Sequence, residues 1–472
     1  MYSLNISIAT MAAALAVAIP LADALAAPNI VVIMTDDQRA DETRAIPHTL
    51  SLIAAQGIVY SNAIAHAPLC APSRATFLTG QYAHNHGVLA NQDPFGYAAL
   101  DNDQTLPVWL QDEGYHTIFI DKYVNGYGED GVLDAPPGWS DWRAALTLQY
   151  YNYAVVDNGT IIEYGGDPWD YRTDVMTSHA VDAIANAPLG RPYFVYVATM
   201  APHEDLCDTC NDLPTPAPRH IGAFAEWTPP RRPPSFNEAD MSDKPAHMQG
   251  LPPIDSDARA RLLTKERRRM ESLLSVDEMV KQIFNAVQMR GDLDNTFFIF
   301  TSDNGYIMGE HRLAKSHKKA PYEESIGVPL YIRPPGGRAM MASTKLVSNQ
   351  DLAPTIVALA GARATRDMDG ESLLKIDPMR AVYLYNYRQK GPPAYEGVRT
   401  RDWVYLRHET GEEELYDLDR DPYQIESRHD RPAYAGVKAD LIGLVDDLRL
   451  CAGATCNCTY DLAETAERSG AK

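Results

Sequence analysis

Long hydrophobic runs, positive charge and repeats are all scarce in this sequence of 472 residues. The longest apolar stretch, residues 11–27, is too short to span a membrane, and there is neither an internal repeat nor a low-complexity tract. Lysine and arginine total 42 against 63 aspartates and glutamates, which gives a net charge of −21. Because nucleic acids and anionic membranes attract basic surfaces, we expect neither as a partner. A small anionic substrate is still compatible, provided that positive side chains gather locally.

The apolar stretch MAAALAVAIPLADALAA ends in Ala24-Leu25-Ala26, which has the small-x-small form of a signal-peptidase site. We therefore expect residues 1–26 to be a signal peptide and the protein to be secreted or periplasmic. The first ten residues contain no Lys or Arg, and Asp23 interrupts the apolar tail. An unusual N-terminal helix is the alternative.

Cysteine is also rare, with six in the chain. Cys207 and Cys210 lie close together, and Cys451, Cys456 and Cys458 cluster near the C-terminus. Export would permit disulfides among these five, with one cysteine left over. A Cys-x-x-Cys zinc half-site is the rival interpretation of the first pair, although no second pair stands at zinc-site spacing.

Four short apolar runs, rich in β-branched or aromatic residues, predict buried strands: Asn29 to Met34, His116 to Ile120, Tyr193 to Ala198 and Thr296 to Phe300. Helical patterns alternate with them at residues 105–113 and 267–287, so we expect an α/β fold with a large, mostly parallel sheet between helices. Prolines between Leu213 and Pro253 predict a long surface excursion. After about Pro378 short alternating segments predict a small antiparallel sheet. The predicted organisation is thus a catalytic domain over 27–377 and a C-terminal subdomain over 378–472.

Cys70 stands at the start of a predicted helix, in the run Cys70-Ala71-Pro72-Ser73-Arg74. Proline suits a first helical turn, and the free N–H groups and positive dipole end of a helix attract anions. The sequence thus predicts an anion site at Cys70. A disulfide-bonded or buried cysteine that happens to precede a helix is the alternative.

Polar side chains follow each of the four predicted strands. The residues are Asp36 and Asp37, Lys122, His203, and Asp303 with Asn304. Each alone could be an ordinary turn, surface or loop residue, but the carboxyl ends of parallel strands share one sheet edge, where α/β folds gather ligands. Three carboxylates and an amide oxygen form a hard ligand set, so we expect Ca²⁺, with Mg²⁺ as the second choice.

With these motifs the chain resembles the type I, formylglycine-dependent sulfatases of the alkaline phosphatase superfamily. The resemblance runs from about Asn29 to about Ser427 and includes TDDQ at 35–38, CAPSR at 70–74, YAHNHGV at 82–88, TSDNG at 301–305 and YEESIGVPL at 322–330. Within that family, KYVNGYG at 122–128, PGW at 137–139 and YNY at 151–153 are most similar to the N-acetylglucosamine-6-sulfatase and arylsulfatase branch.

The resemblance implies a role for each matching residue. Cys70 would be oxidised to formylglycine by a formylglycine-generating enzyme and would complete a metal site made by Asp36, Asp37, Asp303 and Asn304. Arg74 would stabilise that site, and Lys122, His203 and Lys318 would contact the sulfate. His311 would be a further substrate contact or would orient its loop, while His84 and His86 would be structural.

Two positions depart from the family's pattern. Val124 stands where many members have a histidine, and Asn125 is the candidate substitute as a substrate contact. Asp121 replaces a glycine just before Lys122, which is unfavourable near a sulfate unless the carboxylate turns away or pairs.

The implied activity is hydrolysis of a sulfate monoester, of the aryl sulfate or 6-sulfated N-acetylglucosamine type. One hydroxyl of a hydrated aldehyde would attack sulfur and the other would expel sulfate. A phosphonate monoester or phosphodiester hydrolase on the same scaffold is the nearest rival, and an unmodified protein that only binds sulfated glycans is the other. A cysteine phosphatase fits less well, because that chemistry needs Arg six residues after the cysteine, where this chain has Thr76. Aromatic residues at 139, 142, 150, 151 and 153 could stack on a ring or belong to the core.

Overall fold

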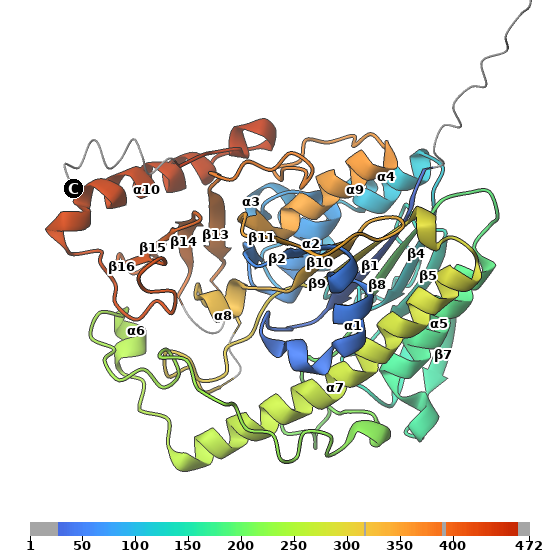
Figure 1. Cartoon of the computed structure of the whole chain (residues 1–472), viewed down its shortest axis with the longest axis horizontal. Helices are drawn as coiled ribbons and strands as arrows, with labels where there is room; N and C mark the ends of the chain where they lie inside the picture. Colours follow the sequence, from blue (N-terminus) through green and yellow to red (C-terminus); the bar gives the residue numbers. More distant parts are fainter. Residues whose placement is uncertain (1–26, 316–317, 389–392, 461–472) are drawn as a thin grey trace, which may run out of the picture.

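A ten-stranded mixed sheet runs through the middle of the protein in this computed structural model, which describes residues 27–315, 318–388 and 393–460 (Figure 1). Its central strands β9, β1, β8, β4 and β5 are parallel neighbours, and antiparallel pairs stand on either side of them. In sheet order the strands are β11 (Met341–Ser343), β2 (Ile58–Tyr60), β10 (Leu330–Arg333), β9 (Thr296–Ser302), β1 (Asn29–Thr35), β8 (Tyr193–Ala198), β4 (His116–Asp121), β5 (Asp141–Ala145), β6 (Tyr153–Asp157) and β7 (Thr160–Tyr164). The expected α/β fold with a mostly parallel sheet is confirmed.

Strand β1 is apolar at every central position because both of its faces are buried. Ile30, Val32 and Met34 belong to the hydrophobic core on one face of the sheet, whereas Val31 and Ile33 belong to the core on the other. Side chains alternate between faces, so a strand with helices on both sides must be apolar at every position. The helices of the first face are α2 (Cys70–Thr79), α4 (Leu106–Asp112) and α9 (Leu352–Ala360), and those of the second are α1 (Pro47–Leu52), α5 (Arg172–Asn186) and α7 (Ser256–Met289) (Figure 1).

Helix α7 is longer than the sequence pattern predicted. Its 34 residues begin at Ser256, where the Asp255 side chain caps the helix by accepting a hydrogen bond from Ala258 N at 2.7 Å. Among its first thirteen residues, 256–268, only Leu262 is buried. That section carries no apolar stripe, so the pattern is readable only from about Arg267 onward.

The C-terminal part forms the predicted antiparallel sheet, in the order β13 (Val382–Asn386), β14 (Tyr395–Arg399), β15 (Trp403–His408) and β16 (Glu413–Asp417). Helix α10 (Ala435–Leu448) packs on it through Leu441, Val445 and Leu448. The segment between Leu213 and Pro253 is irregular apart from η6 (Pro218–His220) and α6 (Ala246–Gln249), as its prolines predicted. The domain boundary at residue 378 stays a prediction, and the predicted signal peptide lies outside the described residues. No helix in the described part of the chain has the length and apolar character needed to cross a membrane.

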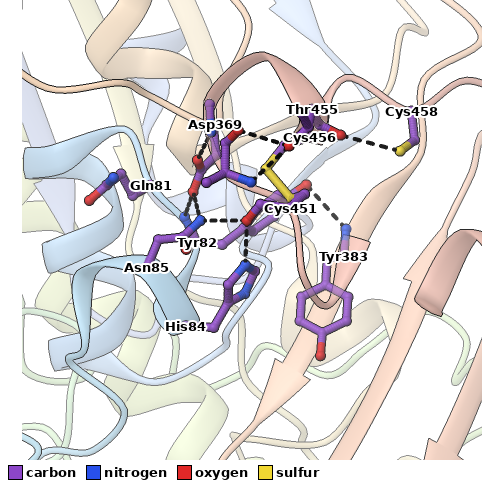
Figure 2. Close-up of a disulfide and its surroundings, with 12 residues drawn as sticks. Gln81, Tyr82, His84, Asn85, Asp369, Tyr383, Cys451, Thr455, Cys456 and Cys458 are labelled. Atoms are coloured by element: carbon purple, nitrogen blue, oxygen red, sulfur yellow. Dashed lines mark hydrogen bonds between the residues drawn. A yellow bond between two sulfur atoms is a disulfide. The ribbon is translucent and has the colours of Figure 1, made fainter. Parts of the chain in front are cut away.

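A disulfide closes a short loop near residue 451, and hydrogen bonds connect this loop to the segment that follows α2 (Figure 2). Cys451 and Cys456 are bonded, and the carbonyl oxygen of Cys451 accepts hydrogen bonds from His84 Nε2 at 3.1 Å and Asn85 Nδ2 at 2.9 Å. His84 and Asn85 belong to α3 (Ala83–His86). The second disulfide joins Cys207 to Cys210, in agreement with the disulfide interpretation of that pair. Cys458 takes part in neither disulfide.

Candidate active site

Helix α2 begins at Cys70 and is buried along its whole length. Leu69 is extended and Gly80, at φ 68°, ends the helix with a bond from its N–H to the carbonyl oxygen of Thr76 at 2.8 Å. The N–H of Ala71 donates to Asn91 Oδ1 at 3.0 Å. The Cys70 thiol is fully buried, donates to Asp36 Oδ1 at 3.3 Å and accepts from Lys318 Nζ at 2.9 Å. The nucleophile position of the sequence analysis is thus surrounded by charged groups.

Two adjacent strands bring the predicted metal ligands together. Strands β1 and β9 are parallel with Thr35 opposite Ser302, so the residues just beyond them meet at one edge of the sheet. Asp36, Asp37 and Asp303 offer carboxylate oxygens that all lie within 4.8 Å of one another. The N–H of Asp37, whose φ is 66°, donates to Asp303 Oδ1 at 3.0 Å.

Asn304 completes this oxygen-rich cluster. Its Nδ2 donates to Asp37 Oδ1 at 2.7 Å, whereas its Oδ1 is buried and has no hydrogen-bond partner among the described residues. A buried acceptor without a donor is the state expected of a ligand to a cation, and carboxylate and amide oxygens suit Ca²⁺ or Mg²⁺. The residues present therefore fit a hard divalent ion.

Positive side chains surround the same carboxylates. The guanidinium of Arg74 donates to Asp303 Oδ2 at 2.9 Å, to Asp36 Oδ2 at 3.0 Å and to the carbonyl oxygen of Lys122 at 2.6 Å. Lys122 Nζ pairs with Asp36, and Lys318 Nζ lies 2.8 Å from Asp37 Oδ1. These contacts link the nucleophile helix to the ends of β1, β4 and β9.

His203 approaches the cluster from beyond β8. Its Nε2 lies 3.8 Å from Asp37 Oδ2, and its Nδ1 is 2.7 Å from the carbonyl oxygen of Glu204. Because a carbonyl only accepts, Nδ1 carries the proton in this contact and Nε2 of the neutral ring has a free lone pair. Burial and the charge of Lys318 lower the pKa of His203, which favours this neutral form.

The charges set the protonation of the acidic groups. Burial opposes ionisation of Asp36, but the charges of Lys122, Arg74 and Lys318 together hold the pKa of its carboxyl well below the usual value. Burial and the charge of Asp36 raise the pKa of Asp303 to about 6. Burial and Asp36 also raise the pKa of the Cys70 thiol to about 12, so an unmodified Cys70 is protonated at neutral pH. Since the thiolate is the reactive form, plain cysteine chemistry is disfavoured here.

A pocket of about 340 Å³ opens onto the cations. Lys122, His203 and Lys318 line it together with Asn91 and Asn125. The Oδ1 of Asn125 is buried without a hydrogen-bond partner in the described part of the chain. An anionic ester can therefore approach Lys122, His203 and Lys318, with amide groups available for its organic part.

Comparison with known proteins settles the family. A family model described as Sulfatase matches residues 28–362, which is well over half of the chain. The chain belongs to the sulfatase family. A second model, N-sulphoglucosamine sulphohydrolase C-terminal, matches residues 309–450 of this sulfatase.

Two curated relatives illustrate the match. The N-acetylglucosamine-6-sulfatase of Homo sapiens is 35% identical over 386 residues, covering 78% of this chain and 67% of that protein. An arylsulfatase of Volvox carteri is 32% identical over 494 residues, covering 91% of this chain and 75% of that protein. Sulfatases are sulfuric ester hydrolases, so this chain is an enzyme of that class, and the family generally uses a metal ion and a formylglycine.

Solved structures share the fold. One, in complex with its substrate D-glucosamine-2-N,6-O-disulfate, has a TM-score of 0.76 and 25% identity and covers 89% of this chain and 97% of that chain. The phosphonate monoester hydrolase of Agrobacterium radiobacter has a TM-score of 0.69 at 20% identity, covering 89% of this chain and 95% of its own. At that identity the likeness shows a common architecture alone.

Other residues singled out in the sulfatase sequence do not line the cation-lined pocket. His311 is fully buried, with Nδ1 2.6 Å from Glu238 Oε2 and its ring 4.0 Å from that of Tyr322. These contacts are of a kind that orients a loop, and the substrate contact of His311 stays a prediction. His86 Nε2 lies 3.0 Å from Thr76 Oγ1 on α2, in keeping with a structural role.

One of the two departures from the family's pattern, Asp121, is resolved locally, whereas the role of Asn125 in place of a histidine stays a prediction. Asp121 turns away from the pocket and pairs with Arg172, whose Nε donates to Asp121 Oδ1 at 2.7 Å. The aromatic residues near it are mostly core, since Trp139, Trp142, Tyr150 and Tyr153 are buried while Tyr151 is partly exposed.

Three residues of the site surroundings escaped sequence reasoning. Arg269 of α7 donates through Nη2 to the carbonyl oxygen of Asp37 at 2.5 Å, Asn349 Nδ2 donates to Ser73 Oγ at 2.7 Å, and Asn91 accepts from Ala71. Arg269 had a signal in the sequence, because it stands beside Met270 at the edge of an apolar stripe. Asn91 lies in a loop and Asn349 begins the short 3-10 helix η8 (Asn349–Asp351), and neither carries a sequence pattern of its own.

Proposed function

We propose that the sulfatase hydrolyses sulfate monoesters with a formylglycine derived from Cys70 and a Ca²⁺ ion. Asp36, Asp37, Asp303 and Asn304 would hold the ion, which would supply Lewis-acid charge to a sulfate oxygen. The observation that carries the proposal is that Cys70 Sγ contacts both Asp36 and Lys318, and that Lys318 in turn lines the cation-lined pocket. A formylglycine hydrate would supply a hydroxyl nucleophile and a second hydroxyl to expel sulfate.

The surrounding residues have separate tasks in this proposal. Arg74 holds Asp36 and Asp303 in place through buried ion pairs. Burial opposes the charge of Lys318, but Asp37, Cys70 and Asp36 hold its pKa well above the usual value, so it stays cationic and binds a sulfate oxygen with Lys122. Nε2 of His203 has the lone pair that can accept a proton inside the pocket.

We propose an aryl sulfate or a 6-sulfated N-acetylglucosamine as substrate, as in the curated relatives. Asn125 would contact its organic part through the amide, and His311 would be a further contact. Maturation would need a formylglycine-generating enzyme. The predicted signal peptide at 1–26 and the two disulfides support a secreted or periplasmic protein with a catalytic domain over 27–377 and a C-terminal subdomain over 378–472.

Substitution of Cys70 tests the function. We expect Cys70→Ala and Cys70→Ser to abolish hydrolysis of nitrophenyl sulfate while leaving the far-UV spectrum unchanged. Cys458→Ala removes the other free cysteine and is the matched control, with full activity expected. The intact mass of the peptide containing residue 70 should be lower than that of the cysteine form by the difference between H₂S and one oxygen atom. Turnover by Cys70→Ala would refute the proposal.

A rate comparison separates sulfate from phosphonate chemistry. The wild-type enzyme should hydrolyse nitrophenyl sulfate faster than a phenylphosphonate monoester. The reverse order would favour the phosphonate monoester hydrolase. Binding of a sulfated sugar with no turnover of either ester, in a chain whose Cys70 is unmodified, would favour the binding protein.

A further inference from the structure

Asn91 connects the cation-lined pocket to the start of the nucleophile helix. It lies in the loop after α3, is half-buried, and lines the pocket together with Lys122, His203 and Lys318. Its Oδ1 accepts a hydrogen bond from the N–H of Ala71 at 3.0 Å. One end of this side chain is therefore bound to the residue next to Cys70, while the side chain itself forms part of the pocket wall.

The contact with Ala71 fixes which way the Asn91 amide faces. A backbone N–H only donates, so the atom opposite it must be the carbonyl oxygen Oδ1, and Nδ2 is the atom left free. Among the described residues Nδ2 makes no hydrogen bond, and it is accessible to solvent. Because Asn91 lines the pocket, this donor is available to a molecule that enters it.

Helix α2 has few other donors to offer from its first turn. The residue after Ala71 is a proline, which has no N–H, and the N–H of Ser73 already donates to the carbonyl oxygen of Leu69 at 2.9 Å. Cys70 itself is fully buried. Hydrogen bonds in a chain polarise one another, so the bond from the helix to Oδ1 makes Nδ2 of Asn91 a stronger donor.

The charges of the pocket lining decide what kind of acceptor suits this donor. Lys122 and Lys318 both line the pocket, and Lys122 is 4% exposed. Of the two acidic residues in the lining, Glu204 is paired with Lys265 at 3.0 Å and Glu129 is exposed. Hydrogen bonds to an ionised acceptor are about twice as strong as neutral ones, so a free N–H group beside cations favours an anion.

We propose that Asn91 binds a sulfate oxygen of the substrate through Nδ2 while its Oδ1 keeps the hydrogen bond to Ala71. The identity of the anion rests on the proposed function. Asn91 would hold the sulfate group beside residue 70 and leave Asn125 for the organic part. Its contact is then the same for every sulfate ester, whatever alcohol the ester contains.

Asn91→Asp separates the two ends of the amide, because a carboxylate still accepts from Ala71 but has no hydrogen to donate. We expect isothermal titration calorimetry of the full chain with inorganic sulfate to show binding weaker than in the wild type by about tenfold or more, the value of a hydrogen bond to a charged group. The kcat/KM values for nitrophenyl sulfate and for N-acetylglucosamine 6-sulfate should fall by the same factor.

Gln92→Glu is the matched control for the added charge. Gln92 lines the same pocket but is exposed, so its new carboxylate is screened by solvent and salt. We expect it to weaken inorganic sulfate by about threefold at most. Asn91→Ala is the second variant, because it removes the acceptor as well as the donor. It should weaken sulfate as Asn91→Asp does but melt at a lower temperature, since Asn91→Asp keeps an acceptor at the helix N-terminus.

The proposal is overturned if Asn91→Asp and Asn91→Ala bind inorganic sulfate as the wild type does, or if Asn91→Asp loses no more affinity than Gln92→Glu. A fall in kcat/KM for one ester alone would also overturn it, because Asn91 would then contact the organic part. Failure of the proposed function gives a different result. A wild type that binds inorganic sulfate and hydrolyses neither ester would refute hydrolysis, while the calorimetric comparison would still test Asn91.

Discussion

The ion pair between Arg172 and Asp121 offers a sharp test of how the pocket wall is held. Both side chains are about 1% exposed. Besides Asp121, the guanidinium Nη1 donates to the carbonyl oxygens of Thr147 and of Gln149, the latter at 3.2 Å. Thr147 lines the cation-lined pocket, so Arg172 connects the strand end before Lys122 to that wall.

Removing one partner of a buried pair leaves the other charge uncompensated, which destabilises a protein by about 3–5 kcal/mol. We therefore expect Arg172→Met to lower the free energy of unfolding by about that amount. Among the described residues, Asp121 would keep the N–H of Met200, at 3.3 Å from Oδ2, as its one remaining donor. In Asp121→Asn the remaining amide can still accept from Arg172, so the loss should be smaller, about 1–3 kcal/mol. In the double variant no unpaired charge remains, and its loss should fall short of the sum by about 1 kcal/mol or more.

Urea unfolding followed by tryptophan fluorescence measures these differences. Arg219→Met is the control, because Arg219 pairs with Asp174 at 2.6 Å on the surface, where the contribution of a pair is about 0–1 kcal/mol. Strict additivity in the double variant, or a loss in Arg172→Met no larger than in the control, would refute the reasoning.

Three further outcomes are expected. Removing the metal with EGTA should abolish activity and lower the melting temperature, with Ca²⁺ restoring both at lower concentration than Mg²⁺; equal potency of the two ions would contradict the calcium assignment. Burial lowers the pKa of His86 to about 3, so between that value and about 6.5 the unfolded chain binds the extra proton and stability falls as pH falls. Between pH 6.5 and pH 5 the lowered pKa of His86 should reduce the free energy of unfolding by about 2 kcal/mol. In urea unfolding, the stability of His86→Gln should therefore depend less steeply on pH than that of the wild type. Identical slopes would contradict this assignment. Replacing both Cys451 and Cys456 with Ala should lower the free energy of unfolding by about 2 kcal/mol, the loop entropy of a short disulfide, whereas Cys458→Ala should leave it unchanged.

The parallel centre of the sheet was predictable because burial on both faces demands an unbroken apolar run, as in β1, and leaves polar residues just after the strand. Strands β5 to β7 were not predicted, since none of them is a continuous apolar run and Ile161 of β7 is exposed. The small C-terminal sheet was predicted from its alternation, but α10 behind it was not.

The site divides in the same way. Asp36, Asp37, Asp303 and Asn304 follow strands that turned out to be neighbours, so their convergence was predictable from parallel pairing alone. Their partners were not all predictable, because Arg269 reaches Asp37 from a helix more than two hundred residues along the chain and Asn91 reaches Ala71 from a loop. Such contacts depend on how helices dock on the sheet, which local patterns do not encode.

The burial of Cys70 has a consequence for the order of events during biosynthesis. No other protein can reach a thiol that water itself does not reach, so the maturation enzyme of the proposed function would have to act while the residues around position 70 are still an open chain. The contact of Cys451 with α3 joins parts of the chain that are far apart in sequence, so it can form only when the two parts fold together. Under the proposed function, conversion of the thiol would therefore precede this docking.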